Sequence, residues 1–252
     1  MTAVRMFLNW NKQVSASIQD LLDNLVPRDR GWEVFTEQTL PSILKRNTKV
    51  LDVGGGKRPL ISLEQKKKLN LTVIGMDIDE EELAQAPKGS YDGTIVGDIE
   101  QVDLHSSYDL IFSCAVMEHV KNPEAAIKNM GKALTPDGIM AHFVPCRHAL
   151  FASINRYLGP KTSKKILLAF HPDKATSQGF PSYYQDCLPS KFAQFYKNEK
   201  LDIITLEMHY ASDYATFFFP FYLAEALRQI VVKLAKQSDF AETFTIIGKK
   251  GN

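Results

Sequence analysis

The chain has 252 residues, of which 44% are hydrophobic and 23% charged, so it is long and apolar enough to bury a sizeable core. Its formal net charge of +1 argues against a general nucleic-acid binder, and we expect no nucleic-acid partner. No run reaches the ~18 apolar residues of a membrane span, and three scattered cysteines show no disulfide or zinc spacing, which predicts a reduced, cytoplasmic protein with no metal site.

Residues 1–47 are predicted to form a helical cap. Apolar residues recur there at helical spacing until Pro27, at Ile18, Leu21, Leu22 and Leu25. The stretch from Trp32 to Leu44 predicts a second, shorter helix that leads into a glycine-rich motif. We therefore expect this part of the chain to wrap the core that follows it.

Residues 48–145 show short apolar runs separated by helical or polar stretches. Five runs predict strands: KVLDVG, LTVIGMDID, GTIVGDIE, YDLIFSCAV and GIMAHFVP. Helices are predicted between them at Leu60–Leu69, Glu80–Ala86 and Pro123–Leu134, and the turn signal TPDG is expected just before the fifth strand. The runs are apolar on both faces, as strands between two helix layers must be. The alternation favours a parallel sheet with right-handed crossovers.

The remainder of the chain is less regular. Four prolines and two glycines between residues 146 and 190 predict a loop-and-helix insert. A helix in PSKFAQFYKNEK, a strand in LDIITLEMHY, a helix from Phe221 to Lys236 and a final strand in ETFTIIGKK are predicted after it. If the sixth strand is parallel, segments 146–190 and 210–239 both emerge on the ligand side of the sheet. Because no internal repeat or linker is seen, residues 1–252 are expected to form one domain.

The first strand runs into VLDVGGGKRP, a turn of the kind that holds a dinucleotide, a nucleoside triphosphate or another nucleoside cofactor. The dinucleotide fingerprint needs a third glycine at position 59, where this chain has Pro59, and no G-K-[ST] follows for a phosphate-binding loop. Asp52, at the end of the strand, would repel a pyrophosphate and attract a cationic amine. The motif therefore favours a nucleoside that carries an amino-acid end.

Acidic residues also follow the next two strands. Asp77 can accept both hydrogen bonds of a ribose diol, and Asp79 is the competing ribose acid. Asp98 can accept a hydrogen bond from an adenine amino group, while Ile99 packs on the ring and offers its N–H. The combined picture is a ligand with a cationic amino-acid end, a ribose and an adenine.

Five motifs in this order, VLDVGGGKRP, VIGMDID, GDIE, YDLIFSCAVMEHVKNP and LTPDGIMAHFVP, closely resemble the class I S-adenosylmethionine-dependent methyltransferases. The resemblance covers roughly residues 48–146 and is nearest to the broad small-molecule group with EH(V/I) after strand four. It implies an α/β, Rossmann-like, doubly wound sheet of seven mostly parallel strands in the order 3-2-1-4-5-7-6, with only the last strand antiparallel. The chain departs from the D-x-G-x-G-x-G pattern at Arg58, which replaces the last glycine.

The resemblance also implies a cofactor, S-adenosylmethionine, and its product, S-adenosylhomocysteine. The expected cofactor-binding residues are Asp52, Gly54 and Gly56 at the methionine end, Asp77 at the ribose, Asp98 and Ile99 at the adenine, and Ser113 and Cys114 along the cofactor. Ile78 is also expected among the cofactor-binding residues.

Methyl transfer from a sulfonium is an in-line displacement, and a hydroxyl nucleophile needs a general base as well. His119 is the first candidate because it follows strand four, and ordering of its loop is the alternative role. His148, after strand five, is the second candidate, as a base or an acceptor contact. His171 is a weaker one, His142 within the fifth strand is expected in the core or beside the cofactor, and Glu118 is expected to orient a neighbour.

The aromatic run YATFFFPFYL lies in the second insert. It predicts a cover for the sheet, an acceptor pocket, a dimer surface or a peripheral membrane contact through residues 214–235. We expect methyl transfer to a small-molecule or glycan acceptor, at oxygen, with N-methylation as the alternative. A nicotinamide-dependent oxidoreductase and a non-catalytic cofactor-binding partner protein stay open, and the oligomeric state is expected to be a monomer or a homodimer.

Overall fold

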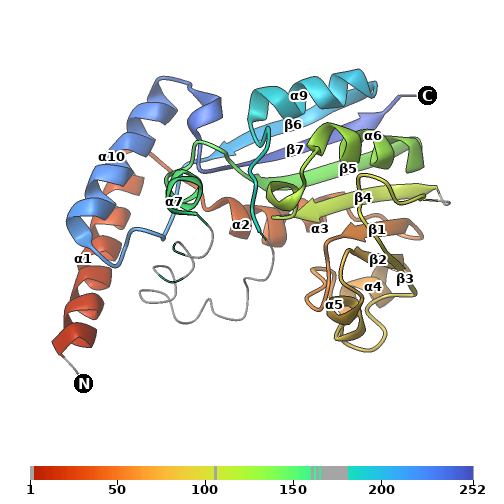
Figure 1. The fold of residues 1–252 in the computed structure, drawn as a ribbon, viewed down its shortest axis with the longest axis horizontal. Coiled ribbons are helices and arrows are strands. Elements are labelled where there is room, and N and C mark those ends of the chain that lie inside the picture. The colour runs from red at the N-terminus through yellow and green to blue at the C-terminus, as the bar shows by residue number, and fades with distance from the viewer. Residues whose placement is uncertain (1–2, 105–106, 160–161, 163–164, 166–180, 252) are drawn as a thin grey trace.

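A seven-stranded sheet in the order β3-β2-β1-β4-β5-β7-β6 forms the centre of the chain in the computed structural model (Figure 1). The structure describes residues 3–104, 107–159, 162, 165 and 181–251. The strands are β1 (Lys49–Val53), β2 (Thr72–Asp77), β3 (Gly93–Val96), β4 (Tyr108–Cys114), β5 (Leu134–Pro145), β6 (Leu201–His209) and β7 (Thr243–Lys250). β1 to β5 pair in parallel, and β7 runs antiparallel to both β5 and β6. The predicted strand order and the antiparallel last strand are therefore confirmed.

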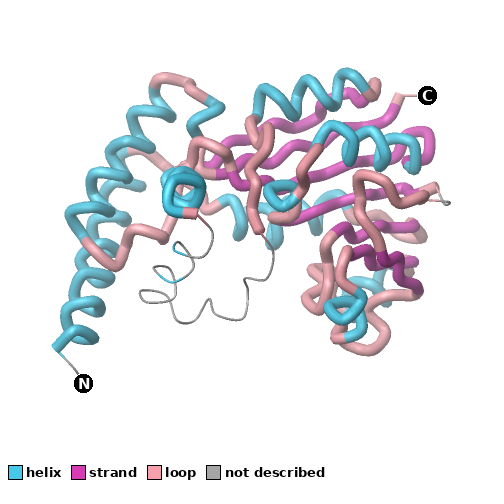
Figure 2. Tube along the Cα trace, in the orientation of Figure 1, coloured by secondary structure: helices cyan, strands magenta, loops and turns pink. Residues whose placement is uncertain are grey.

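Helices cover both faces of the sheet (Figure 2). They are α1 (Ala3–Leu25), α2 (Gly31–Glu33), the π-helix η1 (Val34–Thr39), α3 (Leu40–Ile43), α4 (Leu63–Leu69), α5 (Glu80–Ala84), the 3₁₀ helix η2 (Met117–His119), α6 (Pro123–Ala133), α7 (Leu150–Leu158), α9 (Pro189–Asn198), α10 (Phe219–Leu234) and the 3₁₀ helix η4 (Ser238–Phe240). Ile127 of α6 and Phe192 of α9 are fully buried on one face, and Phe35 of η1 and Leu40 of α3 are buried on the other. The sheet is thus the middle of three layers.

Capping residues set where the helices after β1 and β4 begin. Ser62 Oγ accepts a hydrogen bond from the Gln65 N–H, and Gln65 Oε1 accepts one from the Ser62 N–H, which closes a capping box. Helix α4 therefore starts at Leu63, three residues later than predicted. Asn122 caps α6 by accepting from the Ala125 N–H, and Pro123 fits the first turn.

The fifth strand begins earlier than predicted. The TPDG segment was expected to be a turn before the strand, but β5 already starts at Leu134, which pairs with Tyr108. The extra residues lie in β5, because Tyr108 pairs with Leu134 whereas Leu110 pairs with Ile139, and Asp137 adopts φ 62° within this irregularity. The third strand is shorter than its run, because it ends at Val96 and leaves Asp98 in the following turn.

Helices α1 and α10 lie side by side beyond the carboxyl edge of the sheet, next to α7 (Figure 1). Ile18 and Leu22 of α1 pack against a small cluster in and before α10, made of Ala215, Tyr222 and Ala226. Among the described residues, no helix combines the length and apolarity needed to cross a membrane. His171, one of the weaker candidates for the base, lies outside the described residues.

Candidate functional site

The turn after β1 is packed so tightly that Gly54 and Gly56 leave little space for a Cβ atom. Gly54 has φ +72°, and a Cβ there would lie 2.4 Å from a methyl carbon of Val116. Gly56 has φ +46°, and its Cβ would lie 3.1 Å from Asp77 Oδ2. Both positions therefore combine a backbone conformation that favours glycine with crowding by the next strand ends. The turn presents its backbone directly at the carboxyl edge of the sheet.

Asp52 lies under this turn with only 2% of its surface exposed. Its Oδ2 accepts a hydrogen bond from the Tyr91 hydroxyl at 3.3 Å. Burial raises the pKa of Asp52 to about 7; the hydrogen bonds from Tyr91 and from the Leu60 backbone lower it, and the nearby charge of Asp77 raises it. The two hydrogen bonds offset only part of the effect of burial on Asp52. A cation bound at this edge would therefore stabilise the charged carboxylate.

The two acids after β2 have different surroundings. Asp77 is 9% exposed, its Oδ1 accepts a hydrogen bond from the Asp79 N–H at 3.1 Å, and burial raises its pKa. Asp79 caps α5, because its Oδ1 accepts from the N–H groups of Glu81 and Glu82 at 2.9 and 3.4 Å. The competing ribose acid is thus engaged in capping, whereas Asp77 stands beside Gly56.

The two isoleucines expected among the cofactor contacts differ in exposure. Ile78, directly after β2, is 60% exposed, while Ile99 is 6% exposed and belongs to the main hydrophobic core. The Ile99 carbonyl accepts a hydrogen bond from Asn129, and Asp98 Oδ1 accepts one from the Glu100 N–H at 3.0 Å. Of these two residues, Ile78 is therefore the one with an exposed apolar side chain.

Ser113 and Cys114 end β4. The Ser113 hydroxyl is fully buried and lies 2.7 Å from His142 Nδ1 on the neighbouring strand, and burial lowers the pKa of His142 to about 3. His142 is thus a neutral residue of the core, which is one of the two places expected for it. Cys114 is partly exposed at the strand end, and burial raises the pKa of its thiol.

His119 links the end of β4 to the first insert. Its Nδ1 lies 2.9 Å from the Pro181 carbonyl oxygen and 3.3 Å from Ser182 Oγ, and its Nε2 lies 3.9 Å from Glu118 Oε1. The loop-ordering contact and the neighbouring carboxylate are both present at this residue. The structure therefore gives His119 a fixed position, with Glu118 as its neighbour.

His148 contacts the segment before β7. Its Nδ1 lies 3.1 Å from the Asp239 carbonyl oxygen, and its ring stacks on Phe240 with centroids 4.7 Å apart. These contacts hold the start of the first insert against η4, so the two catalytic candidates are anchored to different segments.

Glu118 was expected to orient a neighbour, but its burial was not indicated by the sequence pattern. It is 6% exposed, and its Oε2 has no hydrogen-bond partner among the described residues. Burial raises its pKa, while His119 opposes that shift. The backbone N–H groups of Tyr183 and Tyr184 donate to the Glu118 carbonyl, so the insert covers this residue. Only the motif MEHV pointed to this position, and burial by a distant segment has no local sequence signal.

Tyr91 is a residue of the site that sequence reasoning missed. It lies between α5 and β3, its hydroxyl reaches Asp52, and its ring is packed against Gly75 of β2. The stretch GSYDG around it carries a turn signal but no pattern that places a tyrosine beside the first strand. No three potential metal ligands come together anywhere in the described part of the chain.

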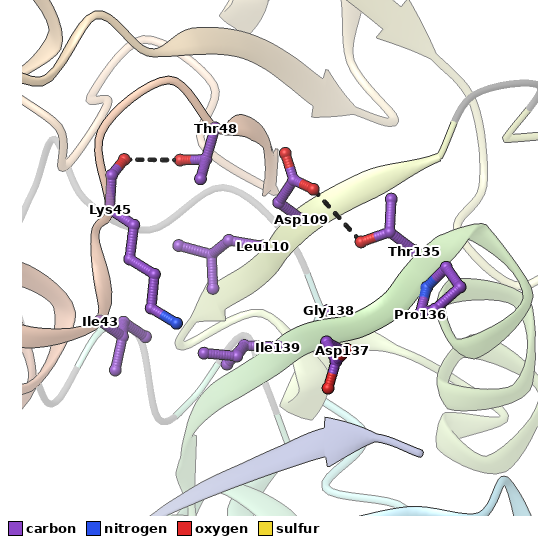
Figure 3. Close-up of a pocket in the computed structure, with 10 residues that line it drawn as sticks. All are labelled: Ile43, Lys45, Thr48, Asp109, Leu110, Thr135, Pro136, Asp137, Gly138 and Ile139. Carbon is purple, nitrogen blue, oxygen red and sulfur yellow. Dashed lines mark hydrogen bonds between the residues drawn. The ribbon is translucent and has the colours of Figure 1, made fainter. Parts of the chain in front are cut away.

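Figure 3 shows a cavity of about 180 Å³ at the opposite edge of the sheet, near the starts of β4 and β5. Its lining includes Asp109, but that carboxylate accepts hydrogen bonds from the Lys49 N–H and the Thr135 hydroxyl. Asp137, at the rim, pairs with Lys249. This cavity is therefore remote from the strand-end acids, and both carboxylates in its lining are already paired.

Comparison with known proteins places this geometry in context. A family model described as a methyltransferase domain matches residues 11–233. An S-adenosylmethionine-dependent methyltransferase from Mesorhizobium loti is 16% identical, with a TM-score of 0.56, and the match covers 85% of this chain and 98% of that one. Phosphoethanolamine N-methyltransferase 2 from Haemonchus contortus, solved with S-adenosyl-L-methionine, is 17% identical, with a TM-score of 0.56 and coverage of 100% and 61%.

A third solved structure, geranyl diphosphate C-methyltransferase from Streptomyces coelicolor A3(2) in complex with Mg2+, geranyl-S-thiolodiphosphate and S-adenosyl-L-homocysteine, is 11% identical. Its TM-score is 0.54, and the match covers 86% of this chain and 76% of that one. No curated protein matches the chain. At these identities the solved structures establish likeness of fold.

Proposed function

Since this chain belongs to the methyltransferase-domain family, we propose that it uses S-adenosylmethionine to methylate a hydroxyl group of a small-molecule or glycan acceptor. The observation that carries the proposal is the pair of buried strand-end acids, Asp52 and Asp77, on either side of the glycine turn. A nucleoside with an amino-acid end offers an amine to the first acid and a ribose diol to the second. S-adenosylmethionine supplies an already activated methyl group, so the chain's own residues must align it and exclude water.

We assign the cofactor contacts as follows. Asp52 with the backbone at Gly54 and Gly56 receives the amino-acid end, and Asp77 with Ile78 receives the ribose. The expected contacts at the adenine and along the cofactor are Asp98, Ile99, Ser113 and Cys114. The 60% exposure of Ile78 supports an apolar contact between its side chain and the cofactor. The side chain of Ile99 is buried, so its proposed contact is made by the backbone N–H.

His119 is proposed as the general base for the acceptor hydroxyl. Donation from Nδ1–H to the Pro181 carbonyl would leave the lone pair on Nε2, the atom that would accept the proton. Glu118, 3.9 Å from Nε2, would stabilise the imidazolium that forms. His148 is retained as the second candidate, in contact with the acceptor.

The acceptor side is supported by aromatic residues from both inserts. Phe151 stacks on Tyr214 with ring centroids 4.6 Å apart and meets Tyr184 edge-on at 6.4 Å. Such rings suit a sugar or an aromatic acceptor. N-methylation is the second candidate, because the buried Glu118 Oε2, which lacks a partner among the described residues, is also what an ammonium acceptor would pair with.

The remaining proposals concern location and assembly. We propose a cytoplasmic biosynthetic enzyme that acts as a monomer or a homodimer. A peripheral membrane contact through residues 214–235 is the other use of the second insert. It is supported by the exposure of Phe221, Leu227, Val231 and Leu234.

The test is methyl transfer from S-adenosylmethionine, labelled in its methyl group, to matched panels of hydroxyl and amine acceptors. Label recovered in a methyl ether supports O-methylation, and label recovered only in methylamines overturns it in favour of the second candidate. A co-crystal with S-adenosylhomocysteine would show which side chains line the space beyond the sulfur.

A further inference from the structure

Tyr91 contacts two consecutive parts of the carboxyl edge. Its hydroxyl lies 3.3 Å from Asp52 Oδ2 and 3.4 Å from the Gly56 carbonyl oxygen. The hydroxyl has one proton, so it donates to one of these acceptors at a time or shares the proton between them. A single side chain therefore links the end of β1 to the turn that follows it.

Two glycines provide the space for this tyrosine. A Cβ on Gly75 would lie 2.6 Å from Cδ2 and Cε2 of the Tyr91 ring. A Cβ on Gly55 would lie 2.3 Å from the Tyr91 hydroxyl oxygen and 2.6 Å from Asp52 Cγ. Both distances are too short for any real side chain, so the ring end and the hydroxyl end of Tyr91 each require a glycine.

This contact explains the triple glycine. In D-x-G-x-G the position between the two glycines is variable, and Gly55 occupies it in this chain. Unlike Gly54 and Gly56, Gly55 is not among the positive-φ glycines. Its small size is needed because the Tyr91 hydroxyl and the Asp52 carboxyl group occupy the space beside it.

We propose that Tyr91 is a positioning residue for the cofactor, which holds the Asp52 carboxylate and the turn at Gly54–Gly56 in the arrangement that receives the amino-acid end. This inference rests on the proposed role of Asp52. Tyr91 acts through Asp52 and the turn, so its loss weakens cofactor binding.

Burial is the main cause of the raised pKa of Asp52, and the contact with Tyr91 opposes it. The groups that act on this carboxyl group are Tyr91, the Leu60 N–H and Asp77; the first two lower its pKa, and burial and Asp77 raise it. Burial and the charge of Asp52 raise the pKa of Tyr91, so the phenol stays protonated and remains a donor. Removing the hydroxyl would raise the pKa of Asp52 above its value of about 7. Binding that needs the carboxylate would then be lost at a higher pH.

The experiment is a calorimetric titration of S-adenosylhomocysteine from about pH 6 to about pH 9. The proteins are the wild type, Tyr91→Phe, Asp52→Asn and the double variant. Tyr157→Phe is the matched control, because Tyr157 is 87% exposed in α7. Tyr91→Phe should weaken binding about 3- to 10-fold, move the midpoint of the pH profile upward, and add nothing further to Asp52→Asn. Fluorotyrosine at position 91, a stronger donor in an unchanged shape, should move the midpoint downward.

Three results separate the possibilities. Equal midpoints in the wild type, Tyr91→Phe and the fluorotyrosine protein would overturn the inference. An affinity loss of the same size with and without Asp52→Asn would also overturn it, since Tyr91 would then act independently of Asp52. Absence of binding in the wild type itself would contradict the proposed function.

Discussion

Asp77 Oδ1 accepts a hydrogen bond from the backbone N–H of Asp79 at 3.1 Å, while Asp79 turns its own carboxylate to the first turn of α5. Two acids two residues apart thus serve different purposes. Asp77→Ala should weaken S-adenosylhomocysteine binding by about 1–3 kcal/mol, because charge-assisted hydrogen bonds to the ribose are lost. Calorimetry measures this directly.

Asp79→Ala is the matched control for that measurement. It should lower the free energy of unfolding by about 0.5–2 kcal/mol through loss of the helix cap, with little change in affinity. Unchanged affinity in Asp77→Ala, together with a loss in Asp79→Ala, would move the ribose role to Asp79.

His119→Ala should lower the single-turnover rate by about 10²–10⁴-fold, which is the usual contribution of a general base. Rapid quench with saturating S-adenosylmethionine separates this step from product release. Glu118→Gln should cause a smaller loss, since it removes the charge beside Nε2 and leaves the imidazole in place.

His148→Ala discriminates between the two histidines. A full rate in His119→Ala, with the large loss in His148→Ala, would show that the base assignment to His119 is wrong. A full rate in both variants would favour an acceptor that needs no base, such as a neutral amine.

Glu242 gives a prediction about stability. It is 1% exposed, its Oε1 accepts from Arg228 at 2.7 Å, and burial with the charge of Glu225 raises its pKa from 4.5 to about 8. The folded state therefore binds this proton more tightly than the unfolded state. The free energy of unfolding should fall as pH rises from about 4.5 to about 8, and Glu242→Gln should remove that part of the dependence.

Denaturant titrations at pH values across this window check the effect. Asp137→Asn is the control, because its pair with Lys249 lies on the surface and should contribute little. The same pH dependence in Glu242→Gln and the wild type would show that another group is responsible.

The positions of the strands were predictable because they depend on local, repeated signals, whereas the strand order followed from the resemblance to the class I methyltransferases. Alternating apolar runs and helical stretches located β1 to β5, and the strand-end acids Asp52 and Asp77 came together because parallel strands end at one edge. The glycine turn likewise followed from its motif. These features need no knowledge of distant segments.

What could not be predicted depends on contacts between distant segments. Glu118 is buried by backbone from residues 183 and 184. Tyr91 reaches Asp52 across β2 only because Gly75 leaves space. Ile78 is exposed and Ile99 lies in the core, and this difference follows from how the chain turns after β2 and β3. The start of β5 depends on a register shift in its pairing with β4, where β5 itself carries the extra residues.

The most direct test of the account is a calorimetric titration of the wild-type protein with S-adenosylmethionine, S-adenosylhomocysteine and NADH. The buried acids at the glycine turn predict that both sulfur nucleosides bind and that the pyrophosphate-containing NADH does not. Binding of NADH without either sulfur nucleoside would contradict it.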